Sequence, residues 1–402
     1  MAFDLQRLRA ETPGCAERIH LNNAGAALMP ESVIRTIQEY IVLESRIGGY
    51  EAADASAEAV EAAYRVVADL VSAAPRNIAF TEHATASYVQ ALSSIRFERG
   101  DLILTTRNDY SSNQIQFLSL EKRLGIRVLQ APDRPEGGVD VQAMADLIAR
   151  HRPRLVSVTH VPTNSGLVQD VAAVGALCRQ HGAWYLVDAC QSIGQMPVDA
   201  RAIGCDFLSA TSRKFLRGPR GAGFLYVSDR ALEGGLEPLF IDMHGAEWTG
   251  EREYRPLPDA KRFETFEFSW ALVLATGEAA QYAQAIGLGA IRDRINLLAG
   301  RLRRALAETS GVRIVDRGPE LCGIVSVAIE GRDARDVMLA LRERGINTSA
   351  QRRGHAVFDY DRKGITSTLR LSPHYYNTED EIAETVAAIE EAAHAETRRT
   401  RR

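Results

Sequence analysis

The chain has 402 residues, of which 46% are hydrophobic and 25% are charged, and its formal net charge is -4. These values are typical of a globular protein large enough for two domains, and the slightly acidic balance does not indicate nucleic-acid binding. Five cysteines without CxxC spacing indicate neither a disulfide framework nor a zinc site, and no apolar run approaches the roughly 20 residues of a membrane helix. We therefore expect a cytoplasmic protein that binds no nucleic acid, membrane or metal.

The N-terminal part of the chain predicts helices around an irregular segment. Residues 1–30 read as a short helix followed by His20–Pro30, where Asn, Gly and Pro are crowded together. Such a composition is typical of a turn. Apolar residues at helical spacing then predict helices over residues 31–48 and 55–71.

A strand and a turn of small residues follow at residues 77–87. Asn77–Thr81 predicts the strand, and a helix is expected to begin near Tyr88. The free backbone N–H groups and the dipole at such a helix start favour an anion. The alternative is that Thr85 or Ser87 merely caps the helix.

Strands and helices then alternate toward the middle of the chain. Leu102–Thr105 and Arg154–Thr159 predict strands, and Val171–His181 predicts a helix. This alternation favours an α/β fold with a mostly parallel sheet. Tyr110 lies at a predicted helix start, where packing is one interpretation of its ring.

The stretch from Trp184 to Tyr226 carries the strongest chemical pattern. A buried strand ends on Asp188, at the strand end where open α/β sheets bind ligands. A second apolar run, Cys205–Ala210, is followed by Thr, Ser, Arg and then Lys214. Glycines at 218, 221 and 223 permit tight turns and close backbone approach before the next strand.

Lys214 and Asp188 together suit pyridoxal phosphate. A lysine amine is a nucleophile only when it is deprotonated, and the neighbouring Arg213 would help to lower its pKa. Pyridoxal phosphate needs such a Schiff-base lysine and a carboxylate that faces its pyridinium nitrogen. A solvated surface charge is the alternative for Lys214.

The C-terminal part predicts a loop and then a second domain. Residues 236–259 show no clear period, and a loop over the site is expected there. Helices and strands resume from about residue 291, and the strand Thr368–Ser372 places Arg370 among apolar neighbours. A buried arginine needs an anion, and its planar fork fits a carboxylate. The alternative is a structural salt bridge.

The order of these motifs resembles the class V aminotransferase family of fold-type I pyridoxal-phosphate enzymes. The resemblance rests on Asp188, Gln191, the run Ser209–Lys214, the run Gly218–Gly221 and Gly223. The family includes cysteine desulfurases, other C–S lyases, kynureninases, isopenicillin N epimerase and true aminotransferases. The resemblance implies an α/β fold whose large domain has a mostly parallel, seven-stranded type of sheet flanked by helices, with a smaller α+β C-terminal domain.

The resemblance also sets the domain boundaries that we expect. Residues 1–30 would be an N-terminal segment that contributes to the active site and the small domain. Residues 31–290 would form the large cofactor-binding domain, and residues 291–402 the small domain.

Carried over by position, the resemblance implies roles at the cofactor. Lys214 would hold pyridoxal 5'-phosphate as a Schiff base and move protons at the substrate Cα, Asp188 would keep the ring nitrogen protonated, and Tyr110 would stack on the ring. The other implied cofactor contacts are Gln191 at the phenolic oxygen, Ala84, Thr85, Thr211 and Arg213 at the phosphate, and Asn164 at a cofactor oxygen or the substrate. Alignment of Asn164 is uncertain by one position, so Thr163 stays open.

The resemblance further implies a substrate subsite and a dimer. Arg370 would bind the α-carboxylate of an amino-acid substrate, and Asn23, Ala24 and Gly25 would line the pocket. Thr265 would give its hydroxyl to the phosphate of the neighbouring subunit's cofactor. The expected assembly is therefore a homodimer with shared active sites.

The choice of reaction depends on a loop just before Arg370. Persulfide-forming desulfurases carry a cysteine there, whereas residues 351–359 contain none, and Cys190 reads as a small buried residue. We therefore expect a C–S β-lyase on a cysteine conjugate or cysteine sulfoxide, because the Lys214 and Gly218 motifs are similar to hercynylcysteine-sulfoxide lyases. An aminotransferase comes second, an epimerase third, and a scaffold that binds the cofactor without turnover is the non-enzyme alternative. Arg352, Arg353 and His355 face either the substrate side chain or solvent.

Overall fold

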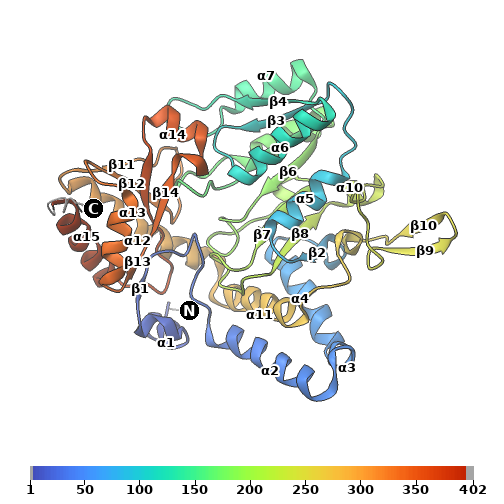
Figure 1. The fold of residues 1–402 in the computed structure, drawn as a ribbon, viewed down its shortest axis with the longest axis horizontal. Coiled ribbons are helices and arrows are strands. Elements are labelled where there is room, and N and C mark those ends of the chain that lie inside the picture. The colour runs from blue at the N-terminus through green and yellow to red at the C-terminus, as the bar shows by residue number, and fades with distance from the viewer. Residues whose placement is uncertain (1–2, 395–402) are drawn as a thin grey trace, which may run out of the picture.

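The structure is a computed structural model that describes residues 3–394. Its largest sheet has seven strands in the order β2-β8-β7-β6-β5-β3-β4 (Figure 1). The strands are β2 Ile78–Thr81, β3 Leu102–Thr106, β4 Arg127–Ala131, β5 Leu155–Thr159, β6 Trp184–Asp188, β7 Phe207–Thr211 and β8 Gly223–Val227. The five strands β3 to β7 run parallel, whereas β8 is antiparallel to both β7 and β2. The mostly parallel sheet predicted from the sequence is present.

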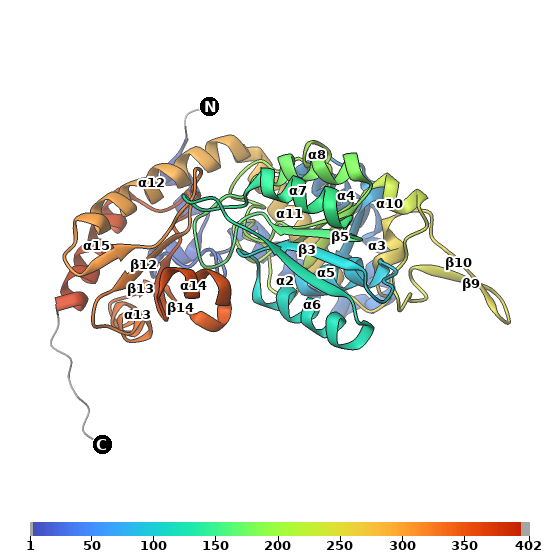
Figure 2. The same ribbon diagram turned by 90° about the horizontal axis from the view of Figure 1, so that it is seen from above.

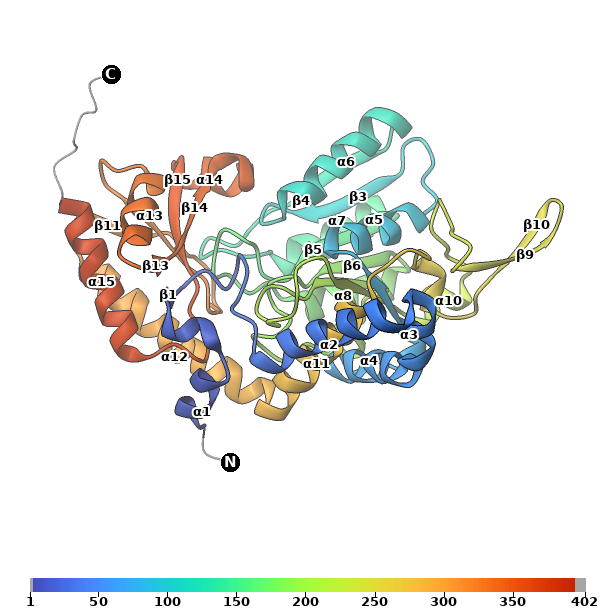
Figure 3. The ribbon, with the colours of Figure 1, turned by 60° about the horizontal axis from the view of Figure 1, so that its bottom comes forward.

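Helices cover both faces of this sheet. Figure 2 shows α7 and α8 on one side and α5 and α6 on the other. Their bounds, with those of the neighbouring helices, are α2 Glu31–Ile47, α3 Gly49–Ala55, α4 Ala57–Leu70, η2 Pro75–Asn77, α5 Ala84–Ser94, α6 Ser111–Leu124, α7 Val141–His151, α8 Val171–His181, α9 Ala200–Ile203, α10 Asp229–Glu233, η3 Ala260–Phe263 and α11 Trp270–Ile286. Helices α2, α4 and α11 pack together (Figure 3).

The strands are apolar on both faces because each face supports a separate core. Ile103 and Leu155 belong to the core that includes residues of α5 and α6, whereas Leu104 and Val156 belong to the core that includes residues of α7 and α8. Successive residues of a strand point to opposite faces, so a strand buried on both sides reads as a continuous apolar run.

The C-terminal sheet is antiparallel, with the order β11-β12-β15-β14. Its strands are β11 Val312–Ile314, β12 Val325–Ile329, β14 Ser349–Arg352 and β15 Ser367–Leu371. The helices of this region are α12 Leu288–Glu308, α13 Ala334–Glu343, η4 Arg353–His355, α14 Val357–Lys363 and α15 Glu379–His394. This mixed region matches the predicted α+β character of the C-terminal part.

The N-terminal segment runs from the C-terminal region to the larger region. After α1 Leu5–Ala10 and η1 Pro13–Ala16, the short strand β1 Ile19–His20 pairs with β13 Ile346–Asn347 (Figure 1). Asn22 then bridges to Ser372, and α2 packs against α11 of the larger region. Residues 20–27 are therefore bonded to both regions, since the Leu21 amide donates to Asn347 O and the Ala27 amide to Arg213 O.

Two local predictions are wrong. Helix α5 begins at Ala84 rather than near Tyr88, because the His83 imidazole caps it by accepting a hydrogen bond from the Ala86 amide. Residues 236–259 contain a hairpin, β9 Ala246–Gly250 and β10 Glu253–Pro256, where a loop was predicted. The hairpin lies at the end of the molecule that is farthest from the C-terminal sheet, and it projects outward from that end (Figure 2). Most of its residues are exposed, so no buried face imposes an alternating pattern on the sequence.

Candidate active site

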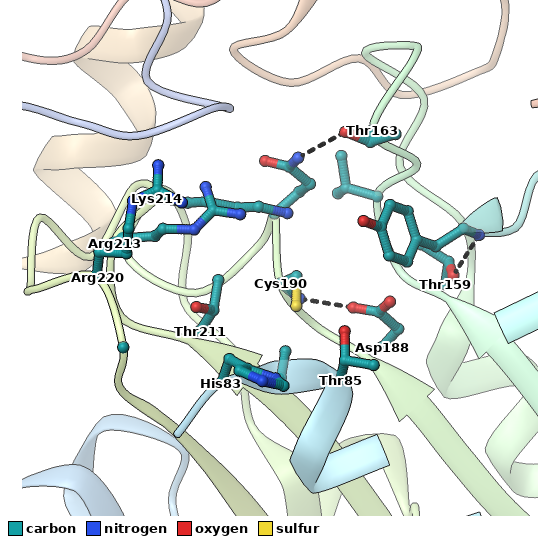
Figure 4. A pocket seen from close by; sticks show the side chains of 15 residues that line it. His83, Thr85, Thr159, Thr163, Asp188, Cys190, Thr211, Arg213, Lys214 and Arg220 are labelled. Atoms are coloured by element: carbon teal, nitrogen blue, oxygen red, sulfur yellow. Dashed lines mark hydrogen bonds between the residues drawn. The ribbon is translucent and has the colours of Figure 1, made fainter. Parts of the chain in front are cut away.

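A cavity of about 320 Å³ opens at the carboxyl ends of β5, β6 and β7 (Figure 4). Thr159, Asp188 and Thr211 end these three strands, and all three line the cavity. The residues predicted at the cofactor that also line it are Ala84, Thr85, Tyr110, Asp188, Gln191, Thr211, Arg213 and Lys214. Side chains from separate segments of the chain thus meet at the edge where α/β sheets bind ligands.

Lys214 lies in a tight turn that follows β7. The Gly218 amide donates to Ser212 O at 2.9 Å, which closes the turn and directs the lysine into the cavity wall. The amine lies 6.0 Å from the centre of the Tyr110 ring. Burial lowers the pKa of Lys214 below its ordinary value of 10.5, and the positive charges of Arg213 and Arg370 lower it further. Cys190 and Asp188 act in the opposite direction and raise this pKa, but burial has the largest effect. A lowered pKa favours the neutral, nucleophilic amine.

Asp188 is held at the bottom of the cavity by donors from two segments. Its Oδ1 accepts from the Cys190 amide at 3.0 Å, and its Oδ2 accepts from Asn113 Nδ2 at 3.2 Å. Asn113 Nδ2 also donates to Asp109 Oδ1 at 3.0 Å, and Thr159 Oγ1 donates to the same Asp109 oxygen. The carboxylate of Asp188 is therefore fixed in direction by the Cys190 amide and by Asn113 at the start of α6, and the role of Asn113 was not predicted from the sequence.

The start of α5 forms the cavity end opposite the C-terminal sheet. Ala84 and Thr85 occupy its first turn beside Thr211, which ends β7. A Cβ atom at Gly223 would lie 2.9 Å from the Ala84 amide nitrogen and 2.6 Å from Ala210 O, so only glycine lets β8 approach this turn. An eleven-residue helix whose first two residues line a cavity is suited to bind a phosphate at its N-terminus.

Two guanidinium groups also line the cavity. Arg213 and Arg220 both line it, and Arg213 also donates a hydrogen bond to Gly25 O. Burial lowers the pKa of Arg213, and the like charge of Arg220 lowers it further. Among residues 3–394, neither arginine forms a salt bridge with a carboxylate. An adjacent pair of cations of this kind favours a bound anion, and planar guanidinium groups suit phosphate.

The other end of the cavity leads to Arg370. Gln191 Nε2 donates to Thr163 Oγ1 and to Ala24 O, both at 3.1 Å. The Arg370 guanidinium donates to Thr163 and, at 3.2 Å, to Asn22 Oδ1. Asn22 was not predicted, although the Asn-Asn pair in this segment was the available signal.

Some predicted site residues lie outside the cavity wall. Asn23 is fully buried and its amide donates to Ser372 O and His20 O. Asn164 donates to Asp359 at 2.7 Å, so the structure brings Thr163 and not Asn164 to the cavity. Thr265 donates to Glu82 at 3.4 Å on an exposed segment. The predicted roles of Asn23, Asn164 and Thr265 are not tested by these positions.

The cysteines are free thiols, and Cys190 is the one that lines this cavity. Burial raises the pKa of its thiol, and the charge of Asp188 raises it further, so the reactive thiolate form is disfavoured. No group of three or more His, Cys, Asp or Glu side chains suited to a metal ion occurs within residues 3–394. Within the same residues, no helix has the length and apolar character needed to cross a bilayer.

The cavity fits pyridoxal 5'-phosphate. Gln191 Oε1 is buried without a hydrogen-bond partner among the described residues, as expected of a polar group facing a ligand. The α5 start with Arg213 and Arg220 suits the phosphate, Lys214 suits the aldehyde, and Asp188 suits the ring nitrogen.

Comparisons with known proteins agree with this fit. The chain matches the family model for class V aminotransferases over residues 19–384. A probable cysteine desulfurase of Methanothermobacter thermautotrophicus is 30% identical over 396 residues, which cover 96% of this chain and 97% of the relative. A probable cysteine desulfurase of Xylella fastidiosa is 28% identical, and the match covers 96% of this chain and 95% of the relative.

Solved structures show the same fold. The apo cysteine desulfurase from Thermococcus onnurineus NA1 has a TM-score of 0.90 and 26% identity, and the match covers 98% of each chain. The cysteine desulfurase CsdA from Escherichia coli has a TM-score of 0.89 at 23% identity.

These relatives contradict the predicted C–S β-lyase, together with the exclusion of a persulfide-forming desulfurase. That exclusion used one feature, the missing cysteine at residues 351–359, whereas the similarity to proteins named cysteine desulfurases extends over nearly the whole chain. A loop substitution is weak evidence about a reaction when the remaining site is retained. The predicted family, fold and cofactor are confirmed. The chain belongs to the class V aminotransferase family and is an enzyme that depends on pyridoxal 5'-phosphate.

Proposed function

We propose that this enzyme is a cysteine desulfurase, which transfers the sulfur of cysteine to a thiol and leaves alanine. The supporting observation is that the chain is similar along its length to relatives named cysteine desulfurases and carries a buried lysine and a fixed Asp188 in one cavity. Arg370 lies behind the cavity wall, hydrogen-bonded to the lining residue Thr163. The reaction balances as cysteine plus a thiol giving alanine plus a persulfide: the C–S bond breaks, a proton replaces sulfur on carbon, and an S–S bond forms.

Each residue has a defined task in this proposal. The cofactor, when bound, supplies an electron sink for charge that develops at the substrate Cα. Lys214 takes and returns the proton at that carbon, and Asp188 holds a proton at the ring nitrogen. Tyr110 would stack on the ring of the bound cofactor, and Arg370 would bind the α-carboxylate of the substrate. The start of α5, with Thr211 and Arg213, binds the phosphate.

The test is the product ratio from cysteine. Purified enzyme loaded with pyridoxal phosphate is incubated with L-cysteine and dithiothreitol, and alanine and sulfide are measured over many turnovers. Equal amounts of both are expected. A Lys214→Ala variant is the matched control for non-enzymatic sulfide release, and it should form no alanine.

The proposal includes a homodimer with shared sites. Apolar side chains are exposed in the two segments next to Thr265 and Asp242: Leu239, Phe240, Met243 and Phe266. The Phe266 amide donates to Asp242, which places the two ends of this segment together. Exposed apolar side chains gathered in two linked segments favour an interface, and a second copy of the chain would bring Thr265 toward its cofactor.

Light scattering tests the dimer. The wild type is expected at twice the mass of the chain, and Phe240→Glu is expected to shift the protein toward monomer and weaken cofactor retention. A monomeric wild type with full cofactor would reject the shared site. Trp248→Ala, on the projecting hairpin, is a comparison variant at an equally exposed aromatic.

We also propose the division into an N-terminal segment 1–30, a large domain 31–290 and a small domain 291–402, which is supported by the separate seven-stranded and four-stranded sheets. A cytoplasmic location is proposed because the five cysteines are free thiols, which suits a reducing compartment.

A further inference from the structure

Neutral groups, rather than an acidic partner, orient Arg370. Its Nη1 donates to Thr163 O at 2.8 Å and to Thr163 Oγ1 at 2.9 Å, and its Nη2 donates to Asn22 Oδ1. Its Nε is buried without a hydrogen-bond partner, and within the described part of the chain no carboxylate forms a salt bridge with it. The direction of the guanidinium therefore depends on where the loop after β5 holds Thr163.

Thr163 also connects Arg370 to the cofactor end of the cavity. Its hydroxyl accepts a hydrogen bond from Gln191 Nε2 at 3.1 Å, which is the dashed line at Thr163 in Figure 4. The same hydroxyl also accepts a hydrogen bond from Arg370. A displacement of Thr163 would move the group that receives the substrate carboxylate relative to the cofactor.

The residue after Thr163 is fastened to the C-terminal region. Asn164 O accepts from Ser326 Oγ at 2.8 Å, and Asn164 Nδ2 donates to Asp359 Oδ2 at 2.7 Å. Asn164 Oδ1 is buried and has no hydrogen-bond partner among the described residues. The bond to Asp359 is thus the interaction that directs the Asn164 side chain.

Asp359 belongs to a buried ion pair on α14. Lys363 Nζ donates to the same Oδ2 at 2.7 Å, one helical turn away, and the two side chains are only 6% and 7% exposed. A buried ion pair adds little stability compared with apolar residues of similar volume, whereas it can specify one geometry. Here the pair fixes the oxygen that receives Asn164.

We propose that Asp359 is a positioning residue for substrate binding. Held by Lys363, it directs Asn164 and thereby keeps Thr163 and Arg370 in the arrangement that receives the α-carboxylate of the substrate. Asp359 does not line the cavity, so it acts through Asn164. The inference rests on the proposed function, because it uses the proposed role of Arg370.

The test is equilibrium binding to the cofactor-loaded protein, read from the cofactor absorbance. L-Alanine and ethylamine are compared, since ethylamine is the same amine without the carboxylate. Asp359→Asn removes the charge, and Asn164→Ala removes the donor but keeps the ion pair. Both variants are expected to weaken L-alanine binding by about tenfold, as for the loss of one hydrogen bond to a charged group, and ethylamine binding by less than twofold.

The control is Asp361→Asn on the same helix. Asp361 pairs with Arg353, and both side chains are 51% exposed, so this variant is expected to bind both amines as the wild type does. The proposal is overturned if Asn164→Ala binds L-alanine within twofold of the wild type, or if L-alanine and ethylamine weaken equally. Asn164→Ala decides the question if Asp359→Asn does not fold.

This experiment is independent of turnover. A wild-type enzyme that makes no alanine from cysteine would reject the desulfurase proposal, whereas the binding comparison would still support or reject the role of Asp359. The two failures are therefore distinguishable.

Discussion

Asn113 donates a hydrogen bond from its Nδ2 to Oδ2 of Asp188 at 3.2 Å, inside the first turn of α6 and at the bottom of the cavity. The two residues are 75 positions apart in the chain, and both are buried. This contact directs the carboxylate that we assign to the cofactor ring nitrogen.

Replacing Asn113 by Leu is expected to lower kcat for alanine formation by about tenfold. Hydrogen bonds that orient a functional group from behind typically change activity by about this factor when they are lost. The steady-state rate with saturating cysteine measures it. Ile115→Ala, on the exposed side of the same helix, serves as the control and should leave kcat unchanged. An unaltered kcat in Asn113→Leu would show that Asp188 is positioned without it.

The lowered pKa of Lys214 predicts how the rate of Schiff-base formation depends on pH. Burial lowers it from 10.5, so the amine is neutral and reactive at pH values above the lowered pKa, even where an ordinary lysine is protonated. The rate at which cofactor-free protein forms a Schiff base with pyridoxal should rise with pH and level off below pH 10.5. Stopped-flow absorbance follows the reaction.

Arg213→Gln should move that profile to higher pH, since it removes a positive charge that lowers the pKa of Lys214. Pyridoxal lacks the phosphate, so a lost phosphate contact does not enter the comparison. A profile that stays in place or moves to lower pH would contradict this electrostatic account. Arg353→Gln, at an exposed position of the C-terminal region, is the control.

Arg370→Gln is expected to raise KM for cysteine by roughly 10- to 100-fold, which corresponds to the loss of charge-assisted hydrogen bonds to a carboxylate. The effect on kcat should be smaller, because Arg370 does not move a proton in the proposal. Initial rates over a range of cysteine concentrations separate the two parameters. An unchanged KM would mean that Arg370 is structural.

Cys190→Ala is expected to keep sulfide release in dithiothreitol within about twofold of the wild type. The buried thiol has a raised pKa and so forms little of the thiolate that attacks sulfur. Cys322→Ala, a buried cysteine outside the cavity wall, is the matched control. A more than tenfold loss confined to Cys190→Ala would identify Cys190 as the sulfur acceptor within the chain.

The cavity residues that the sequence pattern itself indicates are those carried by a continuous motif, whereas Ala84, Thr85 and Tyr110 were predicted from the family resemblance. Asp188, Gln191 and Lys214 lie within one stretch whose strand and turn pattern places them together, and the structure does bring them to one cavity. Asn22 and Asn113 could not be found this way, because their importance comes from contacts with Arg370 and Asp188, which lie far away in the chain.

The fold was predictable where burial leaves a clear hydrophobic pattern in the sequence. The buried strands Trp184–Asp188 and Phe207–Thr211 read as apolar runs, whereas the exposed hairpin of β9 and β10 has no buried face and was missed. Asp359 and Lys363 also escaped notice, since a charged pair on a short helix normally indicates a solvated surface. The structure shows that the pair is buried and that Asp359 is bonded to Asn164.

The most direct test of the central claim is the identity of the three-carbon product from cysteine. Cofactor-loaded enzyme with L-cysteine and dithiothreitol should give alanine and sulfide in equal amounts, with no pyruvate or ammonia. Pyruvate and ammonia in place of alanine would mean that the C–S bond breaks by elimination, and the desulfurase proposal would be wrong.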